Sequence, residues 1–143
     1  MSIAELKAHF IEVFKTSTFI YYDDIPMDGE IAEFIYELNK CARIITTNSC
    51  AGHDKFESNA DYDFISHPYL AFIVDEIGWN LFWEIVLPEI SSECLIHVSC
   101  YPHEKHAIII RAHYDDKKAF WGAVKPTFLK YFHHDQRRNK SRL

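Results

Sequence analysis

Two short runs of residues that favour β-strands lie close together in the chain, and they constrain its fold more than any other feature. The runs are ECLIHVSCY (93–101) and HAIIIRAHY (106–114), and only the polar stretch PHEK separates them. Strand-like runs that are joined by a few polar residues are typical of a β-hairpin. The sequence therefore predicts two antiparallel strands, near 94–101 and 106–114.

Other segments extend the sheet and supply helices to cover it. Further strands are expected near 43–47 (RIITT) and 69–74 (YLAFIV). Apolar residues at helical spacing predict helices after the capping box of Ser2 and Glu5, from Asp28 to about residue 40, across 78–90, and after Asp115 or Asp116.

The segment GWNLFWEIVLPEI (78–90) fits both a strand and a helix. Trp79, Leu81 and Trp83 alternate as they would in a strand, but helical spacing accounts for more of the apolar residues. We therefore predict a helix. Pro88 is expected to mark its frayed or kinked end, and Pro126 is expected to kink or break the last helix.

Helices placed before, between and after paired strands predict an α+β fold. We expect a single domain over residues 1–143, with a mixed, mostly antiparallel sheet of about four to five strands and about three to four helices packed on it. A chain of 143 residues is long enough for one full core. The basic residues of 135–143 predict a frayed tail; the alternative is an arm that touches RNA.

Charge and cysteine usage bear on partners and location. The net charge of −6 argues against sequence-independent binding to nucleic-acid phosphates, so charge does not support RNA binding. No apolar run is long enough to span a membrane, and Glu5, His9 and Glu12 interrupt the N-terminus, so we expect neither a membrane partner nor a secretory signal. The four cysteines are scattered, which predicts free thiols in a cytoplasmic protein.

The strand-like run RIITT leads into a stretch that carries chemically useful groups. Ser49, Cys50 and His53 supply a hydroxyl, a thiol and an imidazole, and Gly52 permits a positive φ or a close backbone approach. A functional site is one interpretation. The other is a plain turn that holds a buried cysteine and a surface histidine.

Each strand of the predicted hairpin carries polar groups on one of its faces. Arg111 and His113 share a strand face with Ile109, and His97 shares a face with Ser99. Such groups are costly within an apolar strand unless the face opens to a pocket or to water, and both interpretations remain. The candidate site joins two catalytic residues, His53 as acid/base and Cys50, to ligand-binding residues Ser49, Gly52, Arg111, His113 and His97.

A zinc site is not expected. The pairs Cys50 with His53 and His97 with Cys100 have the residue types of a zinc set. However, His97 and Cys100 are three positions apart on one predicted strand, so they point to opposite faces. We therefore assign no metal ligand.

The stretch TTNSCAGH (46–53), followed by PYLAFIV, is similar to the wybutosine-synthesising methyltransferase family. In these tRNA-modifying proteins a helix and a strand lead into Thr-Thr-Ser-Ser-Cys-Ser-Gly-Arg. The matching residues here are Thr46, Thr47, Ser49, Cys50 and Gly52. Ser residues of the family pattern are replaced by Asn48 and Ala51, and its Arg by His53.

The resemblance covers about residues 28–75 and implies an α/β domain that binds S-adenosylmethionine and methylates a tricyclic guanosine of tRNA. Replacement of the family's Arg removes a fixed cation, so the fold can carry over without the reaction.

Two classes of function follow. The first is an enzyme or small-molecule binder, methyltransferase-like, with S-adenosylmethionine as ligand by resemblance. The second is a non-catalytic ligand- or protein-binding module, with a homodimer formed through the segment around Trp79 and Trp83. The simpler interpretation of these two tryptophans is ordinary core.

Overall fold

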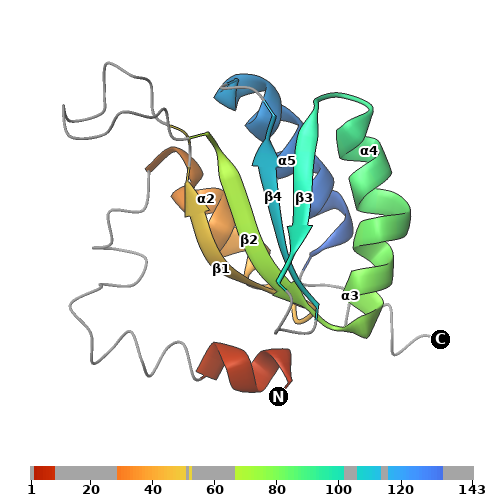
Figure 1. Ribbon diagram of the computed structural model, residues 1–143. Coiled ribbons are helices and arrows are strands. Elements are labelled where there is room, and N and C mark those ends of the chain that lie inside the picture. Colours follow the sequence, from red (N-terminus) through yellow and green to blue (C-terminus); the bar gives the residue numbers. More distant parts are fainter. Residues whose placement is uncertain are drawn as a thin grey trace.

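The computed structural model describes residues 2–8, 29–50, 52, 67–101, 106–113 and 116–133. Its centre is a four-stranded sheet with the order β1-β2-β4-β3 (Figure 1). The strands are β1 (Ile44–Cys50), β2 (Tyr69–Val74), β3 (Ile96–Cys100) and β4 (Ala107–Ala112). Every pairing among them is antiparallel, and β3 and β4 form the predicted hairpin. The α+β prediction is confirmed.

Helices pack on one face of the sheet, which we call the covered face (Figure 1). They are α2 (Gly29–Leu38), α5 (Lys117–Tyr131) and a continuous helix over 76–91 made of α3 (Glu76–Leu81), the π-helical segment η1 (Phe82–Val86) and α4 (Leu87–Ser91). Phe72 of β2 packs edge-on against Phe82 and Phe128, with ring centroids 5.3 Å away in both contacts. All three rings are fully buried, so they form the centre of the core.

The opposite face, which we call the open face, is covered at one end by a short N-terminal helix over 3–8. Ile3 packs there with Ile45, Ile73 and Ala107. The Ser2 hydroxyl accepts a hydrogen bond from the Glu5 N–H at 3.1 Å, as the capping-box prediction requires. No helix in the described part of the chain has the length and apolar character needed to cross a membrane.

One junction ties the start of β1 to the end of β2. Arg43 forms an ion pair of 3.1 Å with Asp75. The other carboxylate oxygen of Asp75 accepts a hydrogen bond of 2.7 Å from the N–H of Gly78 and so caps α3. This contact sets the direction in which the helix over 76–91 leaves the sheet.

The prediction of a helix over 78–90 is confirmed, but the expected end at Pro88 is wrong, because the helix continues to Ser91. Proline lacks an N–H, and its ring crowds the carbonyl four residues earlier, here Glu84. The π-helical turn over Phe82–Val86 widens the backbone at this point, and the N–H of Leu87 bonds to the carbonyl of Phe82. The helix thereby accommodates the proline.

The predicted start of the last helix at Asp116 is confirmed, since its carboxylate accepts a hydrogen bond from the N–H of Ala119 at 3.0 Å. Of the two alternatives predicted at Pro126, the break is wrong, because α5 runs through the proline, and the kink stays a prediction. Val124 and Phe128 are fully buried on either side of the exposed proline, so packing holds the two halves in one helix.

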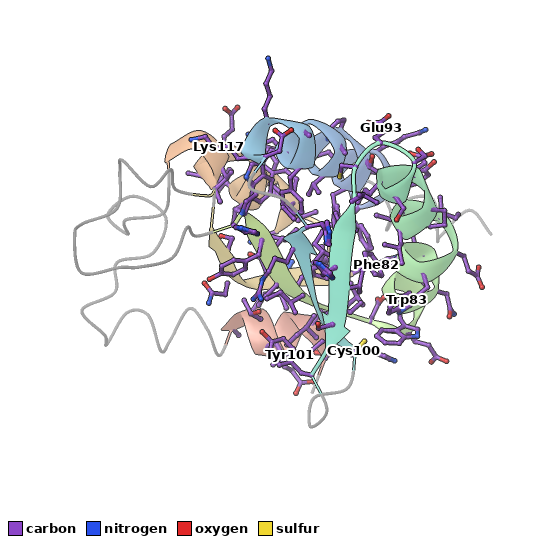
Figure 2. All side chains as sticks on the ribbon, turned by 45° about the horizontal axis from the view of Figure 1, so that its top comes forward. Phe82, Trp83, Glu93, Cys100, Tyr101 and Lys117 are labelled. Atoms are coloured by element: carbon purple, nitrogen blue, oxygen red, sulfur yellow. The ribbon has the colours of Figure 1, made fainter. Side chains whose placement is uncertain are left out.

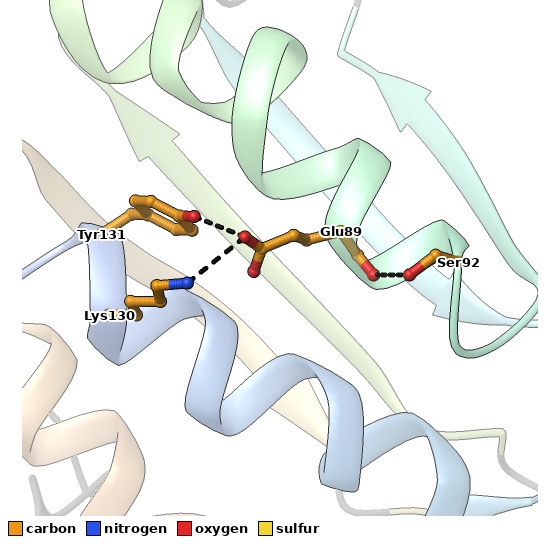
Figure 3. A network of polar contacts seen from close by, with 4 residues as sticks. All are labelled: Glu89, Ser92, Lys130 and Tyr131. Atoms are coloured by element: carbon orange, nitrogen blue, oxygen red, sulfur yellow. Dashed lines mark hydrogen bonds and ion pairs between the residues drawn. The ribbon is translucent and has the colours of Figure 1, made fainter.

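A polar contact joins α4 to the end of α5 (Figure 3). The Tyr131 hydroxyl donates a hydrogen bond to the Glu89 carboxylate, and the Lys130 ammonium lies 3.4 Å from the same oxygen. The hydrogen bond from Tyr131, together with the charge of Lys130, lowers the pKa of Glu89 below its ordinary value of 4.5. Two predictions, the cap at Asp28 and the frayed tail over 135–143, lie outside the described residues.

Candidate functional site

The strand register places four residues in one row across the sheet. Cys50 of β1 pairs with Tyr69 of β2, Tyr69 pairs with Arg111 of β4, and Arg111 pairs with His97 of β3. Residues directly opposite each other in antiparallel strands share a face. Because Tyr69 alternates with the fully buried Leu70, this row lies on the open face.

Arg111 extends beside the aromatic ring of Tyr69. Its guanidinium carbon lies 5.7 Å from the ring centroid, within the range of a cation–π contact. Arg111 is exposed, and it forms no ion pair with any carboxylate of the residues that the structure describes. Its positive charge is therefore balanced by no described acidic group.

Next to Arg111, two histidine rings meet. The Nε2 atom of His97 lies 2.5 Å from the Nδ1 atom of His113, and the ring centroids are 4.5 Å apart. The His113 N–H donates to the carbonyl of Leu95 at 3.0 Å, which continues the β3–β4 pairing by one step. We call Tyr69, Arg111, His97 and His113 the Arg111 cluster. The sequence prediction that Arg111 and His113 share a face is confirmed, and the register adds His97 to that face.

Ser49 does not join this cluster. Strand β1 extends to Cys50, so Ser49 and Cys50 belong to a strand and not to the turn that was expected. The pairing slips by one residue between Thr46 and Asn48, which leaves Thr47 as a β-bulge. Ser49 is therefore opposite Leu70 on the covered face, whereas Arg111 lies on the open face. The predicted site that joins Ser49 to Arg111 is wrong for this reason.

Gly52 has both properties that the sequence suggested. Its φ is +95°, in the region that favours glycine. A Cβ atom placed on Gly52 would lie 3.0 Å from Cδ of Pro68 and 3.3 Å from Cβ of Lys117. Pro68 accepts a hydrogen bond of 3.0 Å from the Ala112 N–H, so Gly52 packs beside the end of the β2–β4 pairing.

Of the two predicted catalytic residues, His53 lies outside the described residues. The backbone register places Cys50 opposite Tyr69. A pocket shared by His53 and Arg111 stays a prediction.

The remaining cysteines do not suggest catalysis or metal binding. Cys41, Cys94 and Cys100 form no disulfide, and burial raises the pKa of both Cys41 and Cys94, which disfavours the reactive thiolate. The described residues contain no group of three or more potential metal ligands. His97 and Cys100 pair with Arg111 and Ile108, on opposite faces, as the argument against zinc required.

Tyr69 was not among the site residues predicted from the sequence. Its position as the first residue of YLAFIV, in phase with Ala71 and Ile73, is the signal that could have placed it on the open face. What could not be read from the sequence is that β2 lies between β1 and β4, which brings Tyr69 beside Arg111.

Comparison of the chain with protein-family models, with curated proteins and with solved structures finds no match.

Proposed function

We propose that this chain is a methyltransferase-like protein that acts in tRNA modification in the cytoplasm, and that it binds S-adenosylmethionine at the Arg111 cluster. The cluster supports a ligand site on the open face. The resemblance of TTNSCAGH to wybutosine-synthesising methyltransferases supports the choice of ligand and reaction. A tRNA substrate rests on that resemblance alone, since the net charge is −6.

The single observation that carries the proposal is the exposed guanidinium of Arg111, which pairs with no described carboxylate and lies beside the ring of Tyr69. Arg stays charged at physiological pH and can bind a carboxylate through two parallel hydrogen bonds. S-adenosylmethionine carries an amino-acid carboxylate and a flat adenine ring. In our proposal Arg111 holds the carboxylate, and Tyr69 offers an aromatic surface to the ring.

The other residues have distinct roles in this proposal. One of the two rings, the one that accepts the hydrogen bond between His97 and His113, keeps an N–H next to Arg111 that can donate to the same ligand. His53 is the proposed acid/base, because its ordinary pKa range lies near neutrality, and Cys50 is the second catalytic candidate. Gly52 shapes the backbone between them and the sheet.

Calorimetric titration of the full chain with S-adenosylmethionine and S-adenosylhomocysteine tests the ligand. Loss of a charge-assisted hydrogen bond costs about 1.5–3 kcal/mol, so Arg111→Gln should weaken binding by at least about tenfold. Lys118→Gln is the matched control, since it removes one positive charge from an exposed position near the start of α5. It should bind as the wild type does. Absence of binding to the wild type contradicts the proposal.

Transfer of a labelled methyl group from S-adenosylmethionine to tRNA tests the reaction. The wild type should transfer the label, and His53→Ala should slow the transfer while it leaves ligand affinity within about twofold. Ligand binding that depends on Arg111 without any transfer would instead indicate the non-catalytic ligand-binding module.

A further inference from the structure

Strand β3 is unusual among the strands because none of its residues is buried. Its side chains are partly buried or exposed, whereas β2 is buried along nearly its whole length. β3 is also at the edge of the sheet, and its sequence IHVSC contains no Lys, Arg, Asp, Glu or Pro. Edge strands are usually protected from pairing with another chain by such residues. No residue within β3 provides this protection.

The pairing with β4 shows which backbone groups of β3 face outward. Tyr101 donates its N–H to the Ala107 carbonyl, and Leu95 accepts from the His113 N–H. In antiparallel pairs the residues that bond to the neighbouring strand alternate with residues that do not. Ile96, Val98 and Cys100 therefore direct their N–H and C=O groups away from β4, toward the outer edge.

The side chains along this edge are self-complementary about Val98. If two copies of β3 pair antiparallel with Val98 opposite Val98, then Leu95 lies opposite Tyr101 and His97 opposite Ser99. Leu95 is 63% exposed and Tyr101 is 45% exposed, and both are among the most exposed large apolar residues of the described chain. In this register each covers the other, and polar residues face polar residues.

The core beneath β3 is also incomplete at this edge. Ile96 and Val98 of β3 pack against the core and are only partly buried. Trp83 and Leu87 of the adjacent helix over 76–91 also pack against the core and are only partly buried. Figure 2 shows this helix alongside β3, with Cys100 and Tyr101 at one end of the strand. A further strand beside β3 would extend the layer that covers these side chains.

We propose that β3 pairs antiparallel with β3 of a second copy about a two-fold axis at Val98, which joins the two sheets into one continuous sheet. The occupant of the edge is a second copy because the pattern around Val98 matches itself. Ile96, Val98 and Cys100 supply the hydrogen bonds, and the Leu95–Tyr101 contacts close both ends. The inference does not depend on the proposed ligand.

Sedimentation equilibrium of the full chain tests this proposal. We expect a dimer, and we expect Val98→Pro to weaken dimerisation by at least about tenfold, because proline removes the outward N–H on the axis but no hydrogen bond to β4. Val98→Ala is the matched control, since it trims the same side chain and keeps the N–H. It should remain dimeric. Circular dichroism of each variant establishes that it is folded.

A disulfide provides a second test that does not depend on the proline variant. Opposed residues of a hydrogen-bonded antiparallel pair have Cα atoms about 5.5 Å apart, within disulfide reach. Val98→Cys should therefore form an intermolecular disulfide under mild oxidation. The wild type should not, because its Cys100 lies opposite Ile96 of the second copy. A monomeric wild type, a dimer that persists in Val98→Pro, or a dimer of Val98→Cys that does not cross-link would each overturn the proposal.

Discussion

The Nε2 atom of His97 and the Nδ1 atom of His113 lie 2.5 Å apart, so one ring donates a hydrogen bond and the other accepts it. Only one proton can occupy the space between the two nitrogens. This contact joins the open face of β3 to the residue that follows β4, directly beside Arg111. The orientation of each ring in the Arg111 cluster therefore depends on the other.

A double-mutant cycle should detect this coupling. We expect His97→Ala and His113→Ala to be non-additive by about 1 kcal/mol in the free energy of unfolding, the usual net value of one hydrogen bond. Urea denaturation of the wild type, both single variants and the double variant measures it. Ser99→Ala combined with His113→Ala is the control, since Ser99 pairs with Ile109. Additive behaviour of the histidine pair would show that the contact contributes nothing.

Gly52 and Gly122 should respond to alanine in opposite directions. Gly52 has a φ of +95° and no room for a Cβ atom, so Gly52→Ala should destabilise the protein by about 1–3 kcal/mol. Gly122 is exposed within α5 and has no atom within 4 Å of its would-be Cβ, so Gly122→Ala should stabilise the helix by about 1 kcal/mol. Thermal unfolding of both variants compares the two. Equal shifts would contradict the geometry described for Gly52.

Phe72 should be among the most sensitive positions of the core. It is fully buried and contacts the rings of Phe82 and Phe128, so Phe72→Ala should cost about 3–5 kcal/mol of unfolding free energy. Denaturant titration measures this cost. Ile77→Ala removes an apolar side chain that is 46% exposed and should change stability by less than about 1 kcal/mol. A cost for Phe72→Ala as small as that of the control would argue against a core centred on this residue.

Glu89 should contribute stability that depends on pH. Its pKa is lower in the folded state than its ordinary value of 4.5, so the stabilisation is complete above that value and is lost as the pH falls through the lowered pKa. The difference in unfolding free energy between the wild type and Glu89→Gln should therefore be constant near neutral pH and shrink below pH 4.5. Tyr131→Phe removes the donor hydroxyl, and in this background the effect of Glu89→Gln should depend less on pH. The same dependence with and without the hydroxyl would rule out the Tyr131 contact as its cause.

Much of the fold could be predicted from the sequence because local patterns determine it. The two β-favouring runs ECLIHVSCY and HAIIIRAHY, separated only by PHEK, predicted the hairpin, and Asp116 predicted the start of α5. The two errors at Pro88 and Pro126 have one origin. The prediction considered only the local cost of the missing proline N–H. Buried packing on both sides of each proline outweighs that cost, and a π-helical turn before Pro88 relieves it further.

The site was harder to predict because it depends on strand order and on a bulge. The shared face of Arg111 and His113 follows from alternation along one strand, so the sequence predicted it correctly, whereas the position of His97 opposite Arg111 depends on the register of the hairpin. The relation of Ser49 to Arg111 involves strands that are not neighbours in the sheet. Simple alternation along β1 gives the wrong face for Ser49 once an unpaired residue intervenes.

The unpaired Thr47 also determines how the chain should be compared with relatives of different length. Thr46 pairs with Phe72, and the next pair along the ladder joins Asn48 to Ala71. A homologous chain that lacked one residue here would form a regular ladder and still present the equivalents of Asn48, Ser49 and Cys50 to the same faces. An alignment gap placed at Thr47 thus preserves structural equivalence, whereas a gap placed a few positions later would equate residues that face opposite sides of the sheet.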